Sequence, residues 1–426
     1  MGHDVIVVGA RVAGSATAML LARAGARVLV VDRARFPSDT LSTHQIQVPG
    51  VARLAAWGLL PALVAAGTPP TRQVEFHRGR TTISGRYPVL HGADAMYSPR
   101  RTVLDKILVD AAREAGAEVR ESTAVEGLVH EGRRVIGVRC SRKSGGRSVE
   151  RAPLVIGADG KNSTVARAVG ARPSRESSAR SVAFYAYWDG LDLPIGEVHS
   201  DDRRVVGAWP TNDGLVITYC AWPASEFAAF RRDPGRSLQA SLDGAGDLGE
   251  RARLATRVSP VRATTDVPNV IRASHGAGWA LAGDAGLVMD PITGQGIGNA
   301  FRDADLLSAA VIDGQGGRRP LATLLARYQK ERDRATRAMF DFTVGLASFP
   351  PMSSGERRLF DAIAEQPGEA DGFLSVLAGV TPVDTFFSAR HLVRLVGLRG
   401  LLELARERQR RPQPRPAPRE AAVVPT

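Results

Sequence analysis

The sequence is poor in cysteine and has no long apolar run, and each shortage excludes a class of protein. The two cysteines, Cys140 and Cys220, stand far apart in a chain of 426 residues, which argues against a disulfide framework or a cysteine-based metal site. No uninterrupted apolar stretch approaches the roughly 20 residues that a membrane-spanning helix needs. We therefore expect no bound metal and no integral membrane association.

Basic residues are not interleaved with aromatic ones, although positive charge exceeds negative charge by 12. A nucleic-acid-binding surface would combine the two kinds of residue, so we expect no nucleic-acid partner. Part of the surplus lies in the Pro/Arg-rich residues 406–426, a composition typical of a disordered tail. The first residues enter an apolar run at Val5 without a preceding basic segment, which predicts a cytoplasmic protein with no secretory signal.

Apolar periodicity predicts an α/β protein interrupted by mostly-β segments. Helical patterns cover residues 50–66 and 102–116, and residues 73–89 alternate like a hairpin. We expect four parts: a discontinuous sheet domain, a β-sheet substrate domain threaded through it, C-terminal helices and the tail. Their ranges are 1–72, 97–180 and 268–345 for the first, 73–96 and 181–267 for the second, 346–405 for the third and 406–426 for the last.

The stretch DVIVVGARVAGSATAMLLARAGARVLVVDR, residues 4–33, has the strand, glycine turn, helix and strand of a dinucleotide-binding unit. Gly9 allows the tight turn, and Gly14 allows the helix to approach the strand closely. The helix N-terminus offers unpaired N–H groups to a pyrophosphate. Asp32 ends the second strand, where a carboxylate can accept hydrogen bonds from a ribose. Arg11 occupies the place of the second glycine of the fingerprint.

Three further segments extend this pattern. VIGADGKNS (155–163) places Asp159 after an apolar strand, and WALAGDAGLVMDPITGQGIGNAFRDADLL (279–307) places Asp284 after another, followed by a glycine-rich turn. RRTVLDKIL (100–108) carries Arg101 at a helix start. Together these segments resemble the FAD-dependent monooxygenases of the p-hydroxybenzoate hydroxylase type, which are related to geranylgeranyl reductases and flavin halogenases. The resemblance spans residues 4 to about 330 and is weak for the substrate.

The resemblance implies a glutathione-reductase-like FAD-binding Rossmann domain with an inserted mostly-β substrate domain and a C-terminal helical segment. FAD would then lie against the first turn, the loop FPSDTLSTHQIQVPG (36–50) and the turn that starts at Pro291. The implied cofactor-binding residues are Gly9, Arg11, Val12, Ala13, Gly14, Asp32, Arg33, Thr43, His44, Gln45, Arg101, Val125, Asp159, Asp284, Pro291, Gly294, Gly296, Ile297 and Gly298.

Individual roles follow from the same comparison. Arg101 would meet the FAD pyrophosphate or ribose, or else be an ordinary arginine at a helix start. Val125 would contact the adenine through its backbone, and Asp284 would bond hydroxyls on the ribitol or pyrophosphate side of FAD. Residues 291–298 would direct helix N–H groups at the flavin, where they stabilise its reduced, anionic form. His44 could also move protons, but a lone histidine is more often structural.

Two positions leave alternatives open. Arg11 is expected to keep a helical backbone and to lay its guanidinium along the phosphate or flavin flank, although a solvated arginine beside the loop would fit equally well. In FYAYW (184–188), Tyr185 and Tyr187 share one face of a strand, and Phe184 and Trp188 share the other. One face should line the substrate cavity, and Tyr185 and Tyr187 are the candidates for substrate contact.

The favoured reaction is a monooxygenation: NADPH or NADH reduces FAD, O₂ gives a flavin C4a-hydroperoxide, and this species oxygenates an aromatic or polyketide-like small molecule, such as a secondary metabolite. No second dinucleotide fingerprint exists, so the nicotinamide cofactor should bind transiently. A halogenase is disfavoured because no two tryptophans stand two apart and the lysines (Lys106, Lys143, Lys161 and Lys330) match no halogenase position. A geranylgeranyl-reductase-like enzyme and a non-catalytic FAD-binding scaffold remain the alternatives.

The last helical pattern, FFSARHLVRLVGLRGLLELARER (386–408), combines apolar spacing with arginines. It would pack against the FAD domain or lie on a membrane surface. The sequence leaves open the substrate, the choice between NADH and NADPH, and the oligomeric state.

Overall fold

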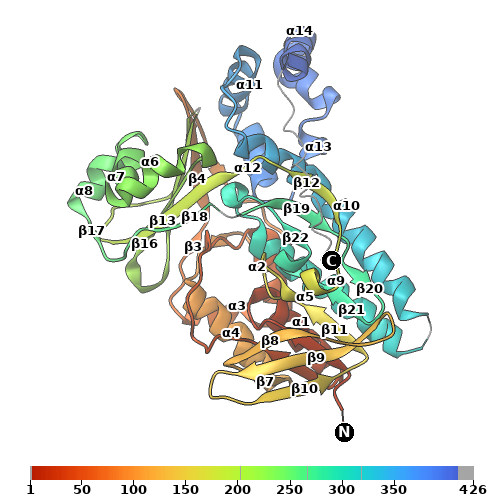
Figure 1. The fold of residues 1–426 in the computed structure, drawn as a ribbon. Coiled ribbons are helices and arrows are strands. Elements are labelled where there is room, and N and C mark those ends of the chain that lie inside the picture. The colour runs from red at the N-terminus through yellow and green to blue at the C-terminus, as the bar shows by residue number, and fades with distance from the viewer. Residues whose placement is uncertain (1, 202, 266, 318, 411–426) are drawn as a thin grey trace.

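The computed structural model describes residues 2–201, 203–265, 267–317 and 319–410, and it contains two large sheets that lie apart in the molecule (Figure 1). The first sheet has six strands in the order β20, β21, β11, β1, β2, β7. All neighbouring pairs are parallel except β20 with β21. The bounds are β1 (Val5–Val8), β2 (Val28–Val31), β7 (Glu118–Arg120), β11 (Leu154–Gly157), β20 (His275–Gly276) and β21 (Trp279–Leu281).

Strands β1, β2 and β11 are continuous apolar runs because both faces of this sheet are covered. Val5 and Val7 belong to the core under the helices, whereas Ile6 and Val8 face a smaller antiparallel sheet. The helices are α1 (Val12–Arg23), α4 (Arg101–Glu114), α9 (Gly296–Gln315) and α10 (Leu321–Ala347). The covering sheet consists of β8 (Thr123–Glu131), β9 (Arg134–Arg142) and β10 (Arg147–Arg151), with α5 (Thr164–Ala168) beside it.

The second large sheet has eight strands, all from the segments 73–96 and 181–267. It is antiparallel except where β14 pairs with β4, and the expected hairpin is β4 with β5. Phe184 and Trp188 face the helices α6 to α8, and Tyr185 and Tyr187 face the main core. The elements are β4 (Gln73–Arg78), β5 (Thr81–Arg86), β13 (Ser181–Asp189), β14 (Gly196–Asp201), β15 (Arg204–Pro210), β16 (Val216–Pro223), β17 (Thr256–Arg257), β18 (Arg262–Thr264), α6 (Phe227–Arg232), α7 (Pro234–Asp243) and α8 (Leu248–Leu254).

The C-terminal helices stand over the end of the eight-stranded sheet and beside α10 (Figure 1). They are α11 (Ser354–Ala364), α12 (Pro367–Leu377), α13 (Val383–Phe386) and α14 (Ala389–Arg410). Helices α11 and α12 pack on β5, and α11 also packs on α14. Helix α14 ends at Arg410, beyond residue 405, the expected end of the helical segment. Residues 411–426 of the expected tail lie outside the described residues.

The remaining elements connect the sheets. The predicted helix over 50–66 is interrupted at Gly58, whose φ of +77° ends one helix before the next begins. The connecting elements are α2 (Val48–Ala56), α3 (Leu60–Ala65), β3 (Pro70–Thr71), β6 (Met96–Tyr97), β12 (Pro173–Ser177), β19 (Asn269–Arg272), β22 (Leu287–Val288), η1 (Asn212–Gly214), η2 (Ala224–Glu226), η3 (Gly283–Ala285) and η4 (Pro291–Thr293).

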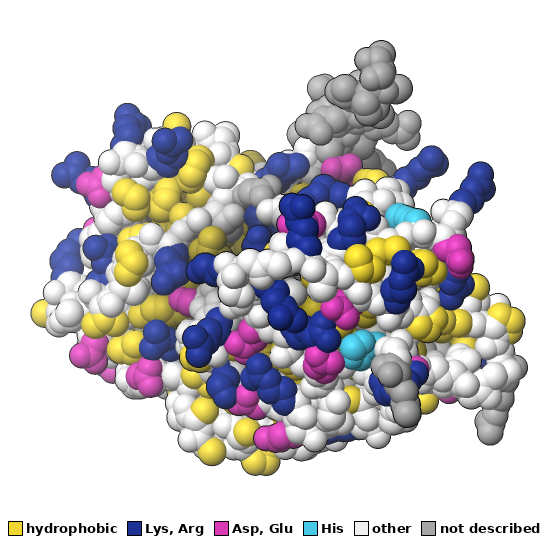
Figure 2. Space-filling model, turned by 60° about the horizontal axis from the view of Figure 1, so that its bottom comes forward, with side chains coloured by type: hydrophobic (Ala, Val, Ile, Leu, Met, Phe, Trp, Pro, Cys, Tyr) yellow, Lys and Arg dark blue, Asp and Glu magenta, His cyan; other side chains and the backbone are white. Residues whose placement is uncertain are grey.

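The surface mixes side chains of both charges. On the face shown in Figure 2, basic side chains alternate with acidic and hydrophobic ones and do not merge into one basic surface. Among the described residues, no helix combines the length and the apolar character that crossing a membrane requires.

Candidate functional site

The first turn of the chain is built so tightly that its glycines cannot be replaced. Gly9 has a φ of +101°, and a Cβ there would lie 2.4 Å from the carbonyl oxygen of Ala158. A Cβ on Gly14 would lie 1.8 Å from the carbonyl oxygen of Gly9. Val12 and Ala13 form the buried first turn of α1. The N-terminus of α1 is thus held directly over the end of β1, where a phosphate could meet its free N–H groups.

The backbone of Arg11 differs from the prediction, and its side chain is tied to neighbouring protein groups. Its backbone is extended, with φ −88° and ψ −160°, and not helical as predicted. Its guanidinium donates to Asp105 Oδ2 at 2.5 Å, and to the backbone oxygen of Ser38 at 3.3 Å and of Asp39 at 3.3 Å. The side chain therefore fastens the loop 36–50 to helix α4.

Asp105 is the centre of a buried ion-pair cluster that sequence reasoning missed. It is fully buried and accepts from Nε and Nη2 of Arg101, four residues earlier on α4, as well as from Arg11. Nη1 of Arg101 has no acceptor among the described residues, and it is the part of this guanidinium still free for a phosphate. The spacing of Arg101 and Asp105 was a visible signal for the pair.

Asp32 is fixed by two backbone bonds at the end of β2. Oδ2 accepts from Ala10 N at 2.7 Å and Oδ1 from Ala34 N at 2.7 Å, which leaves further lone pairs on both oxygens. Arg33 beside it is exposed. Val125 lies near this strand end, because Thr123 N at the start of β8 donates to the Asp32 carbonyl oxygen at 2.8 Å. The start of β8 and the end of β2 therefore lie side by side.

Asp159 uses both of its carboxylate oxygens to cap helix α5. Oδ1 accepts from Ser163 Oγ at 2.5 Å, and Oδ2 accepts from Thr164 N at 2.6 Å. Burial raises the pKa of Asp159, and these hydrogen bonds counteract the rise. Its position beside the Gly9 turn follows from Ala158, the neighbour whose oxygen faces Gly9. In this structure the carboxylate holds protein groups together.

Asp284 lies within electrostatic reach of Arg101. The residue is exposed, yet desolvation by the surrounding protein raises its pKa to about 6; Arg101 opposes the rise and Asp303 adds to it. Asp303, fully buried on α9, accepts from Gly283 N at 2.9 Å and so fixes the turn that carries Asp284. Nothing in the sequence distinguishes Asp303 from the other helical residues that follow the glycine turn.

The turn from Pro291 to Gly298 leaves open space in front of α9. A Cβ on Gly296 or Gly298 would meet nothing within 4 Å, whereas one on Gly294 would lie 1.8 Å from Oε1 of Gln45. Gly294 has a φ of +64°, and Ile297 turns inward to the core. The first turn of α9 therefore borders open space at Gly296 and Gly298, and the loop 36–50 packs against the turn at Gln45.

A large, mostly apolar cavity of about 670 Å³ adjoins this turn. Its walls come from the loop 36–50, the η4 turn, the inner face of the eight-stranded sheet, and helices α10 to α14. Sequence reasoning missed most of these residues because they are scattered from β4 to α14. The principal lining residues are Thr43, Gln45, Gln47, Val74, Phe76, Tyr87, Val198, Trp209, Tyr219, Pro291, Ile292, Phe342, Leu346, Phe349, Leu359, Phe360, Phe373, Leu374, Leu377 and Phe387.

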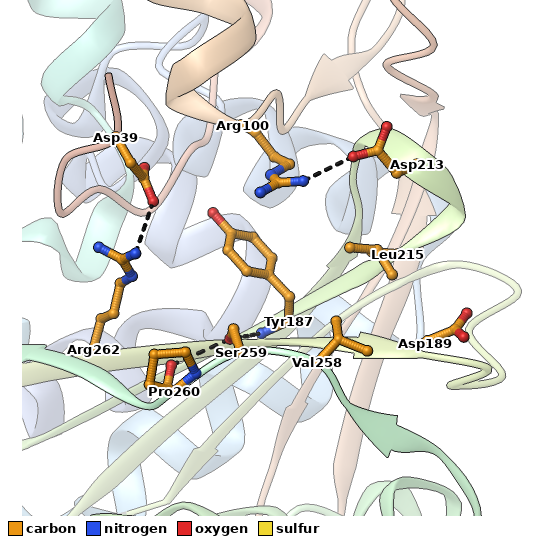
Figure 3. A pocket seen from close by; sticks show the side chains of 10 residues that line it. All are labelled: Asp39, Arg100, Tyr187, Asp189, Asp213, Leu215, Val258, Ser259, Pro260 and Arg262. Carbon is orange, nitrogen blue, oxygen red and sulfur yellow. Dashed lines mark hydrogen bonds and ion pairs between the residues drawn. The ribbon is translucent and has the colours of Figure 1, made fainter. Parts of the chain in front are cut away.

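Tyr185 and Tyr187 do not line that cavity but pack around His44. The His44 ring contacts both tyrosine rings edge-on, at centroid distances of 5.2 and 5.7 Å, and its Nε2 lies 2.7 Å from the Tyr187 hydroxyl oxygen. Tyr187 also lines a second, polar pocket of about 520 Å³ (Figure 3). Arg100 and Arg262 reach into this pocket from opposite sides and pair with Asp213 and Asp39.

Comparison with known proteins places this geometry among flavoproteins. A family profile described as "FAD binding domain" matches residues 2–343. The chain is 31% identical over 355 residues to 6-methylpretetramide 4-monooxygenase of Streptomyces rimosus, which covers 78% of this chain and 82% of that protein. It is 29% identical over 366 residues to digeranylgeranylglycerophospholipid reductase 1 of Methanopyrus kandleri, which covers 82% of this chain and 91% of that protein.

A solved structure of the flavin-dependent brominase Bmp2 shares the fold with a TM-score of 0.79 at 19% identity, over 96% of this chain and 100% of that chain. The predicted fold class and the predicted family resemblance are thereby confirmed.

Proposed function

The chain belongs to the FAD binding domain family and is an FAD-dependent oxidoreductase, and from this premise we propose that it is a monooxygenase. In this proposal, NADPH or NADH supplies the electrons and O₂ supplies one oxygen atom to a small organic substrate. The substrate is an aromatic or polyketide-like molecule held in the large cavity.

The residues of the cleft fit a bound FAD. Gly296 and Gly298 present bare backbone to open space, as a planar ring system lying against the start of α9 requires. The Gly9 turn offers a helix N-terminus to the pyrophosphate, and Arg101 Nη1 adds a charged donor. Asp32 keeps free lone pairs for a ribose, and the exposed Asp284 is accessible to hydroxyls of the ribitol chain.

One observation carries the choice of reaction: the large cavity opens next to this turn and is walled mainly by apolar and aromatic side chains. Its volume of about 670 Å³ suits a molecule of several fused rings. Gln47, Trp209 and Tyr219 each have a buried polar atom without a partner among the described residues, so they are candidates to meet keto or hydroxyl groups.

The protein groups would position the substrate and exclude water. FAD, when bound, supplies the oxygen activation, by the C4a-hydroperoxide route that the family resemblance implies. The N-terminus of α9 favours negative charge on the ring that lies against it. The apolar wall keeps water from the reacting atoms, which limits loss of oxygen as hydrogen peroxide.

Isotope labelling tests the proposal. The purified holoprotein is supplied with NADPH, ¹⁸O₂ and a panel of polycyclic aromatic and polyketide substrates, and the masses of the products are measured by mass spectrometry. We expect a product carrying one heavy oxygen atom. Formation of product without label, or equally well without oxygen, would instead support a reductase like the Methanopyrus relative. If the holoprotein consumes neither NADPH nor NADH, the result would support a non-catalytic FAD-binding scaffold.

A further inference from the structure

Helix α14 has one side against the protein and another in solvent. Together with α11 it projects from the body of the molecule, at the top of Figure 1. Leu392 and Leu404 lie on the inner side, where both line the large cavity. The helical path breaks at Gly397, whose φ is +72°. Residues 398–410 therefore form a helical segment of their own, with an inner and an outer side.

Two leucines on the outer side of this segment are exposed to solvent. Leu398 is 65% exposed and Leu402 is 50% exposed. They stand four residues apart, so they are neighbours on one side of the helix. No other helix in the described part of the chain carries two large apolar side chains with such exposure. Apolar side chains that are exposed as neighbours indicate an interaction site, whereas single ones do not.

The charges of this segment are sorted between its two sides. Arg399 and Arg406 are exposed and flank the leucines at helical spacing. The two glutamates turn toward α11: Glu403 pairs with an arginine of that helix, and Glu407 accepts hydrogen bonds from the residues that begin it. Over residues 398–407, where the side chains are described, the outer side combines leucine with arginine and exposes no carboxylate.

This combination is typical of a helix that lies in a membrane interface. Such a helix buries its apolar side chains at the boundary of the acyl chains and places its basic side chains among anionic headgroups. The sequence after this outer side adds positive charge, because residues 408–426 contain five arginines and one glutamate. An anionic partner therefore fits the charge of this end of the chain.

The position of the large cavity favours a bilayer over an acidic protein as that partner. The cavity is walled mainly by apolar side chains, and it reaches the surface next to α14, since its lining includes the exposed Asp384 of α13. An organic molecule that fits such a cavity is concentrated in lipid. A bilayer against α14 would supply it directly. This one step rests on the proposed function, which places the substrate in the cavity.

We propose that the outer side of α14, formed by Leu398, Arg399, Leu402 and Arg406, docks on an anionic membrane surface. The contact is peripheral: the leucines enter the acyl boundary, and the arginines stay among the headgroups. Two leucines supply only a small apolar area, so the positive charges are needed as a second attraction. The binding is therefore reversible and weakened by salt.

Vesicle sedimentation tests the docking with the full-length holoprotein. Sucrose-loaded vesicles of phosphatidylcholine, with or without phosphatidylglycerol, are mixed with the protein and sedimented. We expect binding to the anionic vesicles, and less of it as sodium chloride is added. Leu398→Gln with Leu402→Gln, and Arg399→Gln with Arg406→Gln, should each lower the partition coefficient about 10-fold or more. Glutamine keeps the helix propensity of these exposed positions, and the flavin spectrum and thermal melting check the fold.

A fluorescent label shows whether α14 itself meets the lipid. Both native cysteines are buried, so an environment-sensitive thiol dye reacts at an introduced surface cysteine. The dye on Leu402→Cys should brighten and shift to the blue when anionic vesicles are added. The matched control is Leu254→Cys, because Leu254 is 90% exposed at the end of another helix, α8. Its dye should not change.

The control for charge is Arg231→Gln with Arg232→Gln, which removes two exposed arginines from α6 and should bind vesicles as the wild type does. Four outcomes overturn the proposal: no binding to anionic vesicles, wild-type binding in the α14 variants, equal weakening in the α6 control, or binding without a change in the dye at residue 402. The first would leave an acidic protein as the partner of these arginines.

Vesicle binding needs no turnover, so it is independent of the reaction. Unlabelled product in the ¹⁸O₂ experiment, together with normal vesicle binding, would remove the proposed function and leave the docking standing. Labelled product without vesicle binding would do the reverse.

Discussion

The proposed cofactor cleft, around the turns at Gly9 and at Pro291–Gly298, and the large cavity meet at the turn Pro291–Thr293, but they are made from different material. The proposed cofactor cleft offers backbone at Gly9, Gly296 and Gly298, with a few fixed carboxylates. The cavity is lined by side chains from helices and strands spread over the chain. Recognition by backbone tolerates little change in sequence, whereas recognition by side chains can be altered one residue at a time.

The sharpest way to test this contrast is to add a side chain where the cleft has none. Gly298→Val should fold, because nothing lies within 4 Å of a Cβ there, but it should block the flavin. We expect FAD affinity to fall more than about 100-fold, which corresponds to about 3 kcal/mol. Fluorescence titration of the apoprotein measures the affinity, and thermal melting confirms the fold.

Gly368→Val is the matched control for that substitution. Gly368 also lies in the first turn of a helix, α12, and also has open space around it, but it lies outside the cleft. Its FAD affinity should equal that of the wild type. Equal loss in both variants would mean that valine disturbs helix starts in general, and that the cleft is not a backbone cradle.

The ion-pair cluster under the cleft should matter for stability more than any surface pair. Asp105→Ala leaves Arg101 nearly buried without its partner and releases Arg11 from α4. We expect a loss of about 2–3 kcal/mol in the free energy of unfolding, somewhat less than for a fully buried pair because Arg11 is partly exposed. Urea denaturation of the apoprotein provides the measurement.

Asp110→Ala, on the same helix, removes the exposed pairs with Lys106 and Arg113 and should cost less than about 1 kcal/mol. If the two aspartates prove equally important, the buried cluster does not organise the loop 36–50.

On the cavity side, a single hydroxyl should affect the substrate but not the cofactor. Tyr219 lines the cavity, and its buried hydroxyl has no partner among the described residues. Tyr219→Phe should raise KM about 3- to 10-fold, the value of one hydrogen bond, and leave FAD affinity unchanged. Steady-state kinetics with the substrate identified by oxygen labelling decides this, and weaker FAD binding would contradict the separation of the two regions.

The smallest effect concerns pH. The pKa of Asp284 is raised to about 6 in the folded protein from 3.8, so the folded state binds more protons than the unfolded state between about pH 4 and 6. Stability of the apoprotein should therefore fall as pH rises through this window. Because the residue is exposed, the change should be about 1 kcal/mol or less. Thermal melts of Asp284→Asn across the window should lack this fall.

The sequence revealed the parts of the site that depend on contiguous residues. The turns at Gly9–Gly14 and Pro291–Gly298 are local backbone conformations, and their glycine spacing signals them directly. The partner of Arg11 lies 94 residues away on α4, so no local pattern could indicate that ion pair. Similarly, the alternation of side chains along β13 places Tyr185 and Tyr187 on one face and Phe184 and Trp188 on the other. Which face becomes covered depends on where helices α6 to α8 pack, and this involves residues far away in the sequence.

Much of the cavity wall belongs to helices α11 to α14, which follow the stretch matched by the family profile. Mutation or recombination could replace this part of the cavity wall in descendants of the protein and leave residues 2–343, which the family profile matches, unchanged. New substrates could then be acquired through changes in these late helices. For an engineer, the same helices are a place to build libraries, with Leu377 kept constant because its carbonyl oxygen accepts from Gln295 Nε2 at the start of α9.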